Sequence, residues 1–261
     1  MNVMKVKTKY SIISRGTEKY SNHGYIGISE PIKDKQYILD IDHGILESEL
    51  NDHVLKFDAN RYSLSNIAVS RFELISRILL ERYKVKDNIL ILGFGNIGFT
   101  CLLSLLKLGY TKISVFTQST RLNMKLLEDK FNIKINFVNK ITDSYTTYID
   151  TTGSSDIIKS VIEQDFSLKD ILILSTPRES KYLIDPLIIN RKNLTIIGGH
   201  ELNGINKKMR NEIFTCILDE NLIYEEVLDE FISINKYSKD IVKELIKKKN
   251  ALIDILILFW N

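Results

Sequence analysis

The clearest chemical signal in this chain is a set of three glycines at the spacing G-x-G-x-x-G, namely Gly93, Gly95 and Gly98. They follow the apolar run 89–92 and precede an apolar helical pattern that ends near Leu108. In this context the first glycine permits a tight turn, the second lets the backbone approach a pyrophosphate, and the third lets the helix pack close to the strand. The helix start, at Asn96 and Ile97, offers N–H groups and the positive end of a dipole to phosphates. The motif therefore predicts a dinucleotide-binding site.

The end of the second expected strand, residues 112–117, should contact the adenosine ribose of such a ligand. Thr117, Ser119 and Arg121 lie there, and residues 117–121 contain no acid that would bind the ribose 2′-hydroxyl. Hydroxyl and guanidinium groups can instead donate to a 2′-phosphate. Arg121 could alternatively be a solvated residue of the next helix, although the dipole disfavours a cation at a helix start unless an anion lies nearby. NADP(H) is therefore favoured over NAD(H).

Polar residues and glycines also follow three later strands, and their expected positions face the same crevice. They are Thr152 and Gly153, then Thr176, and finally Gly199 and His200. In doubly wound sheets, ligands bind at the carboxyl ends of the strands, so these residues are candidates for the ribose and nicotinamide part of the site. Two alternatives stay open: residues 150–153 could form a simple Asp/Gly turn, and His200 could be a surface histidine.

The alternation of strands and helices from Asn88 onward predicts an α/β fold with a doubly wound parallel sheet. Its strands are continuous apolar runs, which is typical of strands covered on both faces. We expect strands at 89–92, 112–117, 135–138, 147–149, 170–175 and 194–197, and helices at 97–108, 120–131 and 156–164.

The flanks have a different pattern, with short extended runs in residues 1–60 at 3–7, 11–13, 37–41 and 54–57. Helices are expected at 66–83, 208–219 and 237–249. The closing apolar run 252–260 should be a strand that pairs back into the N-terminal β region, because an isolated strand would be an exposed edge. We expect a nucleotide-binding domain of residues 73–224 inserted in a β domain of residues 1–72 and 225–261.

Composition excludes several classes of protein. A net charge of +3 in 261 residues is too small to indicate nucleic-acid binding. No signal peptide and no apolar run long enough to span a membrane is visible. Cys101 and Cys216 lie in apolar helical patterns, so we expect buried thiols in a reducing, cytoplasmic setting rather than a disulfide or metal pair.

The order of motifs resembles the medium-chain dehydrogenase/reductase superfamily. Besides the glycines, the resemblance rests on Ile13-Ser14-Arg15-Gly16-Thr17-Glu18, His23-Gly24-Tyr25-Ile26-Gly27, Asp150-Thr151-Thr152-Gly153 and Leu194-Thr195-Ile196-Ile197-Gly198-Gly199. The SRGTE form is most similar to the bacteriochlorophyllide-dehydrogenase or bi-domain oxidoreductase subgroup. The resemblance implies a Rossmann domain inserted in a small, reduced GroES-like β domain.

The resemblance also implies catalytic roles and one loss. Thr17 takes the position of a proton-relay hydroxyl, and Arg15 stands where zinc-dependent members have a cysteine ligand. His23 falls near the family's histidine ligand, but one histidine does not make a tetrahedral zinc site. We therefore expect no zinc, and Arg15 either binds an anionic or oxygen-bearing substrate group or pairs with Glu18 at the surface.

These observations predict a zinc-independent, NADPH-dependent oxidoreductase that reduces a carbonyl or an activated double bond of a small molecule. Natural-product or cofactor tailoring is the expected setting, and the resemblance leaves a homodimer open. The alternative is a non-catalytic nucleotide-binding sensor or partner subunit, since the metal ligands are absent and the β domain is short.

Overall fold

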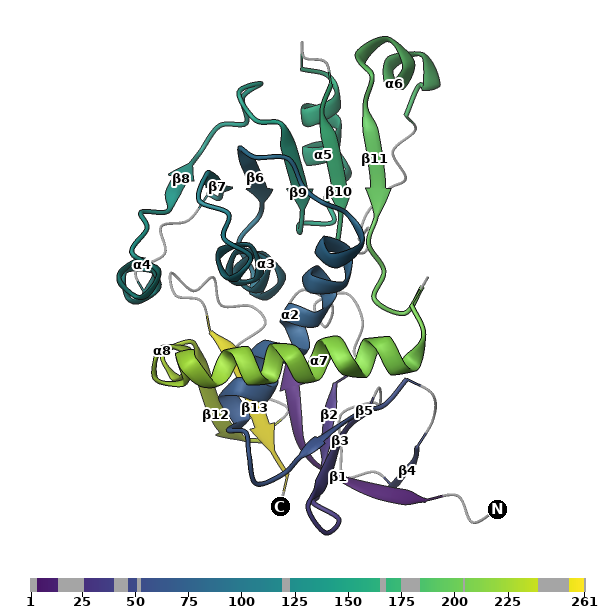
Figure 1. Cartoon of the computed structure of the whole chain (residues 1–261), viewed down its shortest axis with the longest axis vertical. Coiled ribbons are helices and arrows are strands. Elements are labelled where there is room, and N and C mark those ends of the chain that lie inside the picture. The colour runs from purple at the N-terminus through teal and green to yellow at the C-terminus, as the bar shows by residue number, and fades with distance from the viewer. Residues whose placement is uncertain are drawn as a thin grey trace. The chain divides into compact units, whose positions relative to one another are not determined.

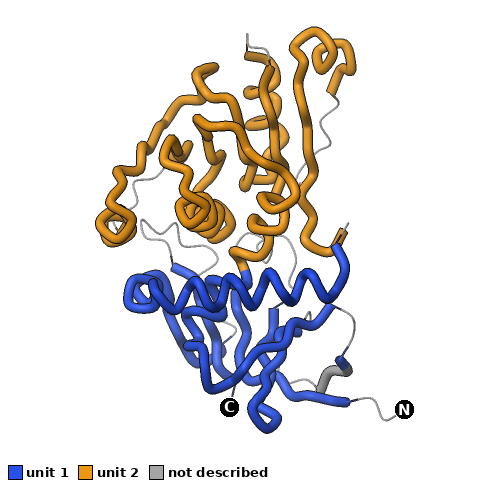
Figure 2. The backbone as a smooth tube through the Cα atoms, viewed as in Figure 1, with its two compact units in different colours: residues 1–71, 204–261 blue, residues 72–203 orange. Residues whose placement is uncertain are grey.

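The structure is a computed structural model that describes residues 4–13, 26–39, 47–50, 53–118, 123–164, 168–174, 184–203, 205–238 and 254–260. The chain forms two compact units (Figures 1 and 2). Unit 1 comprises residues 1–71 and 204–261, and unit 2 comprises residues 72–203. Helix α2 (Leu64–Arg82) contains the first boundary between them. Among the described helices, none has the length and apolar character needed to cross a membrane.

Unit 2 holds a parallel sheet of six strands in the order β11-β10-β9-β6-β7-β8. The strands are β6 (Ile89–Leu92), β7 (Ile113–Phe116), β8 (Asn136–Val138), β9 (Thr147–Asp150), β10 (Asp170–Ile173) and β11 (Thr195–Gly198). All four residues of β6 and of β9 are buried, as expected for strands covered on both faces. Counted from β6, the order is the 3-2-1-4-5-6 arrangement of a Rossmann fold. The predicted doubly wound parallel sheet is confirmed.

Within its described residues, unit 2 has four helices between its strands, and the prediction found three of them. They are α3 (Asn96–Lys107), α4 (Lys125–Phe131), α5 (Ser155–Ile162) and α6 (Pro186–Lys192). The prediction missed α6, although its start has a clear signal: the Asp185 side chain accepts from the Leu187 N–H, and proline follows the cap. The predicted start of the 120–131 helix was also wrong, because Asn123 and Met124 are not helical and α4 begins at Lys125.

Unit 1 holds a sheet in the order β12-β13-β1-β2-β3-β5, with β4 pairing to β1. The strands are β1 (Lys5–Ile13), β2 (Gly27–Ser29), β3 (Lys35–Leu39), β4 (Glu47–Glu49), β5 (Leu55–Asp58), β12 (Ile232–Lys236) and β13 (Ile255–Phe259). Two of the predicted runs, 3–7 and 11–13, form the single strand β1, which changes register against β2 between Thr8 and Tyr10. The sequence pattern did not reveal β12.

The closing strand pairs back into the β domain, as predicted. Strand β13 lies between β1, which it pairs antiparallel, and β12, which it pairs parallel. Its residues Ile255, Leu256, Ile257 and Leu258 are fully buried. Residues 239–250, which hold most of the helix predicted at 237–249, lie outside the described residues; Tyr237 itself is not helical, because its N–H extends the sheet by donating to Phe259.

Helix α7 (Lys207–Asn221), followed by η1 (Leu222–Tyr224) and α8 (Glu225–Asp229), belongs to unit 1. The rings of Phe214 and Phe57 meet edge to face at 6.4 Å, and the Asn66 side chain donates to the Leu218 carbonyl at 3.0 Å. These contacts with β5 and α2 place the second boundary near residue 204, whereas the sequence prediction placed it at 224. The predicted burial of both thiols holds for Cys101 but is wrong for Cys216, which is exposed on the outer side of α7.

Candidate functional site

The topology of unit 2 brings two loops together at the carboxyl end of its sheet. Strands β6 and β9 are parallel neighbours, but the chain continues from them in opposite directions across the sheet. From β6 it goes to β7 on one side, and from β9 it goes to β10 on the other. Residues 93–98 follow β6 and residues 151–154 follow β9. In open parallel sheets this switch point is where ligands bind.

Two of the three motif glycines are required by packing within the protein. Gly93 has a φ of +89°, and a Cβ atom there would lie 2.5 Å from Thr152 Cγ2. A Cβ atom on Gly98 would lie 2.4 Å from the Gly93 carbonyl oxygen and 3.0 Å from Thr151 Oγ1. At Gly98 the contact is with backbone, which cannot move aside, and at Gly93 the positive φ adds to the contact with the Thr152 methyl group, so both positions disfavour any side chain.

Gly95 is different, because apart from its neighbours in the chain no atom of the described residues lies within 4 Å of the position its Cβ would take. Its φ of −91° and ψ of −162° are extended values open to any residue. Gly95 is the N-cap of α3, and no side chain caps this end of the helix. The first-turn N–H groups of a helix have no intrahelical acceptors, and here they adjoin an exposed glycine. The open space above Gly95 therefore fits the close approach of an anionic group.

The loop after β9 is a hydrogen-bonded turn built on Asp150. This carboxylate is 1% exposed, and its Oδ1 accepts from the Thr152 N–H at 2.9 Å and from the Thr152 hydroxyl at 2.6 Å. The Thr152 hydroxyl in turn accepts from the Ser154 N–H at 3.0 Å. Because the Thr152 hydroxyl already donates its hydrogen to Asp150, it cannot donate to a ligand as well, and Thr152 affects the site only through the conformation of the turn. The Asp turn considered at the sequence level is present, and Gly153 completes it with a φ of +68°.

Thr151 ties this loop to the glycine turn, a role that the sequence did not suggest. Its hydroxyl donates to the Leu92 carbonyl at 2.9 Å, and its N–H donates to the same oxygen at 3.0 Å. Thr151 also supplies one of the atoms that exclude a side chain at Gly98. The only hint in the sequence is the Asp-Thr-Thr-Gly run itself.

The other described strand ends hold Thr117, Gly199 and His200. Thr117 is half-buried and donates its N–H to Val138 at 3.1 Å. A Cβ atom on Gly199 would lie 2.7 Å from Leu79 Cδ2, so packing alone requires this glycine. His200 is exposed, and its Nδ1 accepts from the Leu202 N–H at 3.2 Å. In the neutral ring, Nε2 then carries the hydrogen and can donate to a ligand.

The helix that follows the glycine turn is anchored by a buried polar network with α2. The Glu73 carboxylate, fully buried, accepts from Lys107 Nζ at 2.8 Å and from the Ser104 hydroxyl at 3.1 Å, and lies 3.6 Å from Arg77 Nη2. Burial, and secondarily the Glu73 carboxylate, raises the pKa of the nearby Cys101 thiol, so this thiol is a poor nucleophile. No local pattern in the sequence indicates this network, since Glu73 is more than 30 residues from both Ser104 and Lys107.

Several predicted residues lie outside the described ranges. They are Arg15, Thr17, His23, Ser119, Arg121 and Thr176. Their roles stay predictions. Within the described ranges, no three histidine, cysteine, aspartate or glutamate side chains come together in a way that could hold a metal ion.

Comparison with known proteins supports the fold. No protein-family model matches the sequence, and no curated protein matches it either. Solved structures do match. TarJ from S. aureus, in complex with NADPH, has a TM-score of 0.70 at 18% identity, covering 100% of this chain and 92% of that chain.

Two further structures give similar values. Galactitol-1-phosphate dehydrogenase from Escherichia coli has a TM-score of 0.69 at 14% identity, covering 98% of this chain and 92% of that chain. The yhdH oxidoreductase from Salmonella enterica, in complex with NADP, has a TM-score of 0.71 at 13% identity, covering 99% of this chain and 91% of that chain. At these identities the likeness establishes the fold, which is the one that the resemblance to medium-chain dehydrogenases implied.

Proposed function

We propose that the chain is an NADPH-dependent oxidoreductase that acts on a carbonyl or an activated double bond of a small molecule. The observation that carries the proposal is the contrast among the motif glycines. Packing and backbone conformation account for Gly93 and Gly98, whereas a Cβ at position 95 would enter open space, which leaves room for a ligand to approach the backbone. The three solved structures named above support it, because two of them hold NADPH or NADP and two are named as a dehydrogenase and an oxidoreductase.

Each part of the cofactor would contact a different group of the residues that follow the strands of unit 2. Gly95 and the first turn of α3 would receive the pyrophosphate. Thr117, Ser119 and Arg121 would bind the 2′-phosphate. The turn at Thr152 and Gly153, together with Thr176, Gly199 and His200, would border the ribose and nicotinamide. The bound nicotinamide supplies a hydride, and the chain's own residues supply binding, orientation and a proton.

The resemblance assigns the remaining roles to residues near the N-terminus. Thr17 would relay a proton to the reduced substrate, Arg15 would bind an anionic or oxygen-bearing substrate group, and His23 would be a further donor. We propose that they act without zinc, because the positions of the family's cysteine ligands hold other residues. Tailoring of natural products or cofactors is the setting we propose.

The proposal is tested by measuring binding and turnover together. NADPH should bind more tightly than NADH in calorimetric titrations. Arg121→Ala should weaken NADPH about tenfold or more, as expected for a hydrogen bond to a charged group, and leave NADH nearly unchanged. Equal losses for both nucleotides would contradict the 2′-phosphate role.

The catalytic part has its own readout. NADPH oxidation is followed with a panel of ketones, aldehydes and enones, in wild type and in Thr17→Val. Loss of a proton relay should lower turnover by about 10²–10⁴ without a matching loss of NADPH affinity. NADPH binding without turnover across the panel would favour the non-catalytic alternative, a sensor or partner subunit.

A further inference from the structure

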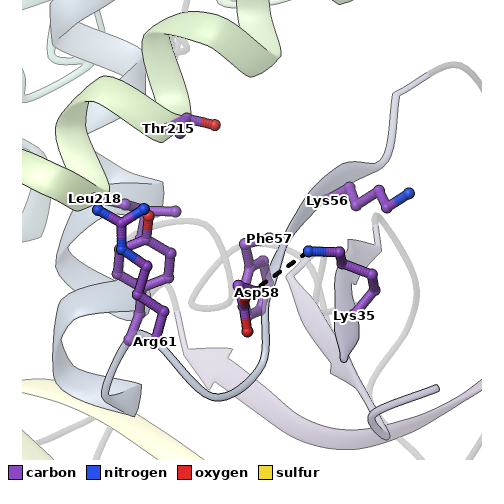
Figure 3. Close-up of a pocket in the computed structure, with 8 residues that line it drawn as sticks. Lys35, Lys56, Phe57, Asp58, Arg61, Thr215 and Leu218 are labelled. Carbon is purple, nitrogen blue, oxygen red and sulfur yellow. Dashed lines mark ion pairs between the residues drawn. The ribbon is translucent and has the colours of Figure 1, made fainter. Parts of the chain in front are cut away.

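Unit 1 contains a pocket of about 300 Å³ that the proposed reaction does not use (Figure 3). It is formed by strands β3 and β5, the segment that connects β5 to α2, and helix α7. All of these parts belong to unit 1, so the pocket does not depend on the sheet of unit 2. Its volume is at the lower end of the range for small-molecule sites.

The floor of the pocket is apolar and well packed. Phe57, Tyr62 and Leu218 line it and are 4%, 8% and 0% exposed. The Phe57 ring is supported from behind by Phe214, and the Tyr62 hydroxyl donates to Asp219 Oδ1 at 2.6 Å. Tyr62 therefore presents its ring to the cavity while its polar end is satisfied elsewhere. The small area that Phe57 and Tyr62 leave exposed can contact a compact apolar group, whereas Leu218 is fully covered.

The rim carries more positive than negative charge. Lys35, Lys56 and Arg61 line the cavity with a single acid, Asp58. Figure 3 shows Arg61 on one side of the space and the two lysines on the other, with Phe57 and Asp58 between them. The Lys35 ammonium points toward Asp58, whereas the Lys56 side chain is drawn pointing away from the space (Figure 3). Cations placed on opposite sides of a cavity can neutralise a dianion that neither side could neutralise alone.

The ion pairs of the rim leave cationic capacity unused. Lys35 lies 3.8 Å from Asp58, a long separation between two partly exposed groups. Arg61 is held at 2.9 Å by Asp219, which already accepts from Tyr62, and a guanidinium has further N–H donors. Lys56 is exposed and takes part in none of the ion pairs found among the described residues. Its flexible stem can bring the ammonium group to a bound anion.

We propose that this pocket binds a small phosphate monoester, with the phosphate between Arg61 and the lysines and the apolar body on the floor. Phosphate fits better than a monocarboxylate, because it carries about two charges and offers three oxygens to donors on two sides. The ligand class is a compact phosphate ester whose organic part is about the size of one ring.

Phenyl phosphate is the probe, titrated by calorimetry into the full-length Gly95→Val variant. This background removes phosphate binding at the glycine turn of unit 2, so the result is independent of the proposed cofactor site. The expected result is saturable, salt-sensitive binding of one equivalent. Benzoate, which has the same ring and one charge, should bind at least tenfold more weakly.

Two exposed positions allow variants that leave the fold intact. Thr215→Glu places a carboxylate at the pocket from the exposed side of α7, and it should weaken phenyl phosphate at least tenfold. Lys56→Gln should weaken it about threefold to tenfold. Lys208→Gln, a lysine of α7 that is 86% exposed and does not line the pocket, is the matched control and should bind normally.

Absence of saturable binding would overturn the proposal. So would equal affinity in Thr215→Glu, Lys56→Gln and the Lys208→Gln control, or benzoate binding as tight as that of phenyl phosphate. Unchanged melting temperatures of the three variants show that an affinity loss is local.

Discussion

Gly95 and Gly98 are three residues apart, but the structure predicts opposite consequences for their substitution. At Gly95 a Cβ would enter open space, and at Gly98 it would meet the Gly93 carbonyl oxygen at 2.4 Å. Gly95→Val should therefore affect the ligand, whereas Gly98→Ala should affect the protein itself.

The stability difference can be estimated from these contacts. Gly98→Ala forces a carbon into packed backbone and should lower the free energy of unfolding by about 1–3 kcal/mol. In Gly95→Val, the weaker N-cap costs about 0.5 kcal/mol, and the smaller entropy of the unfolded chain offsets a similar amount. Gly98→Ala should thus lower the Tm by roughly 2–10 °C, and Gly95→Val should leave it nearly unchanged.

For the affinity for NADPH, the larger effect is expected in Gly95→Val. The valine side chain in Gly95→Val occupies the space proposed for the pyrophosphate, so the Kd for NADPH should rise at least 100-fold, which is about 2.7 kcal/mol. Calorimetric titration with NADPH and a thermal melt of each variant measure both quantities. Wild-type affinity in Gly95→Val, or a loss of Tm equal to that of Gly98→Ala, would refute the reasoning.

Three further predictions concern groups whose environments are set by burial. Glu73→Leu should destabilise the protein by about 3–5 kcal/mol in urea unfolding, because it removes the buried carboxylate from Lys107; adding Lys107→Met should recover part of that loss if the reasoning holds. Burial, with help from Asp219, raises the pKa of Tyr62 to about 12, so the folded state favours the protonated phenol. That contribution to stability is complete below pH 10 and is lost as the pH rises toward 12, so Tyr62→Phe should flatten this part of an alkaline unfolding curve. Thiol titration with a chromogenic disulfide should label the exposed Cys216 in the native state and the buried Cys101 only in denaturant; rapid labelling of both would contradict the burial of α3.

Much of the fold of unit 2 could be predicted from sequence because its signals are local. A buried strand, a glycine turn and an amphipathic helix follow one another within 20 residues, and strands and helices alternate along most of the unit. The strands expected at 89–92 and 147–149 therefore agree with β6 and β9 almost residue for residue. The prediction missed α6 and β12. Helix α6 buries none of its residues and strand β12 is only partly buried, so neither has a clear apolar pattern in the sequence.

The sequence by itself determined the glycine turn and the helix start on which the nucleotide-site prediction rests, because turn geometry and helix ends depend on residues that are neighbours in the chain. The sequence assigned a turn to Gly93 and close packing to Gly98, but only the tertiary structure identified their distant partners, since Thr151 and Thr152 reach these glycines from more than 50 positions away. The same is true of the Glu73 network and of the pocket between β5 and α7. Such contacts depend on how the strands and helices pack, and no local pattern of residue types encodes which distant side chains will meet.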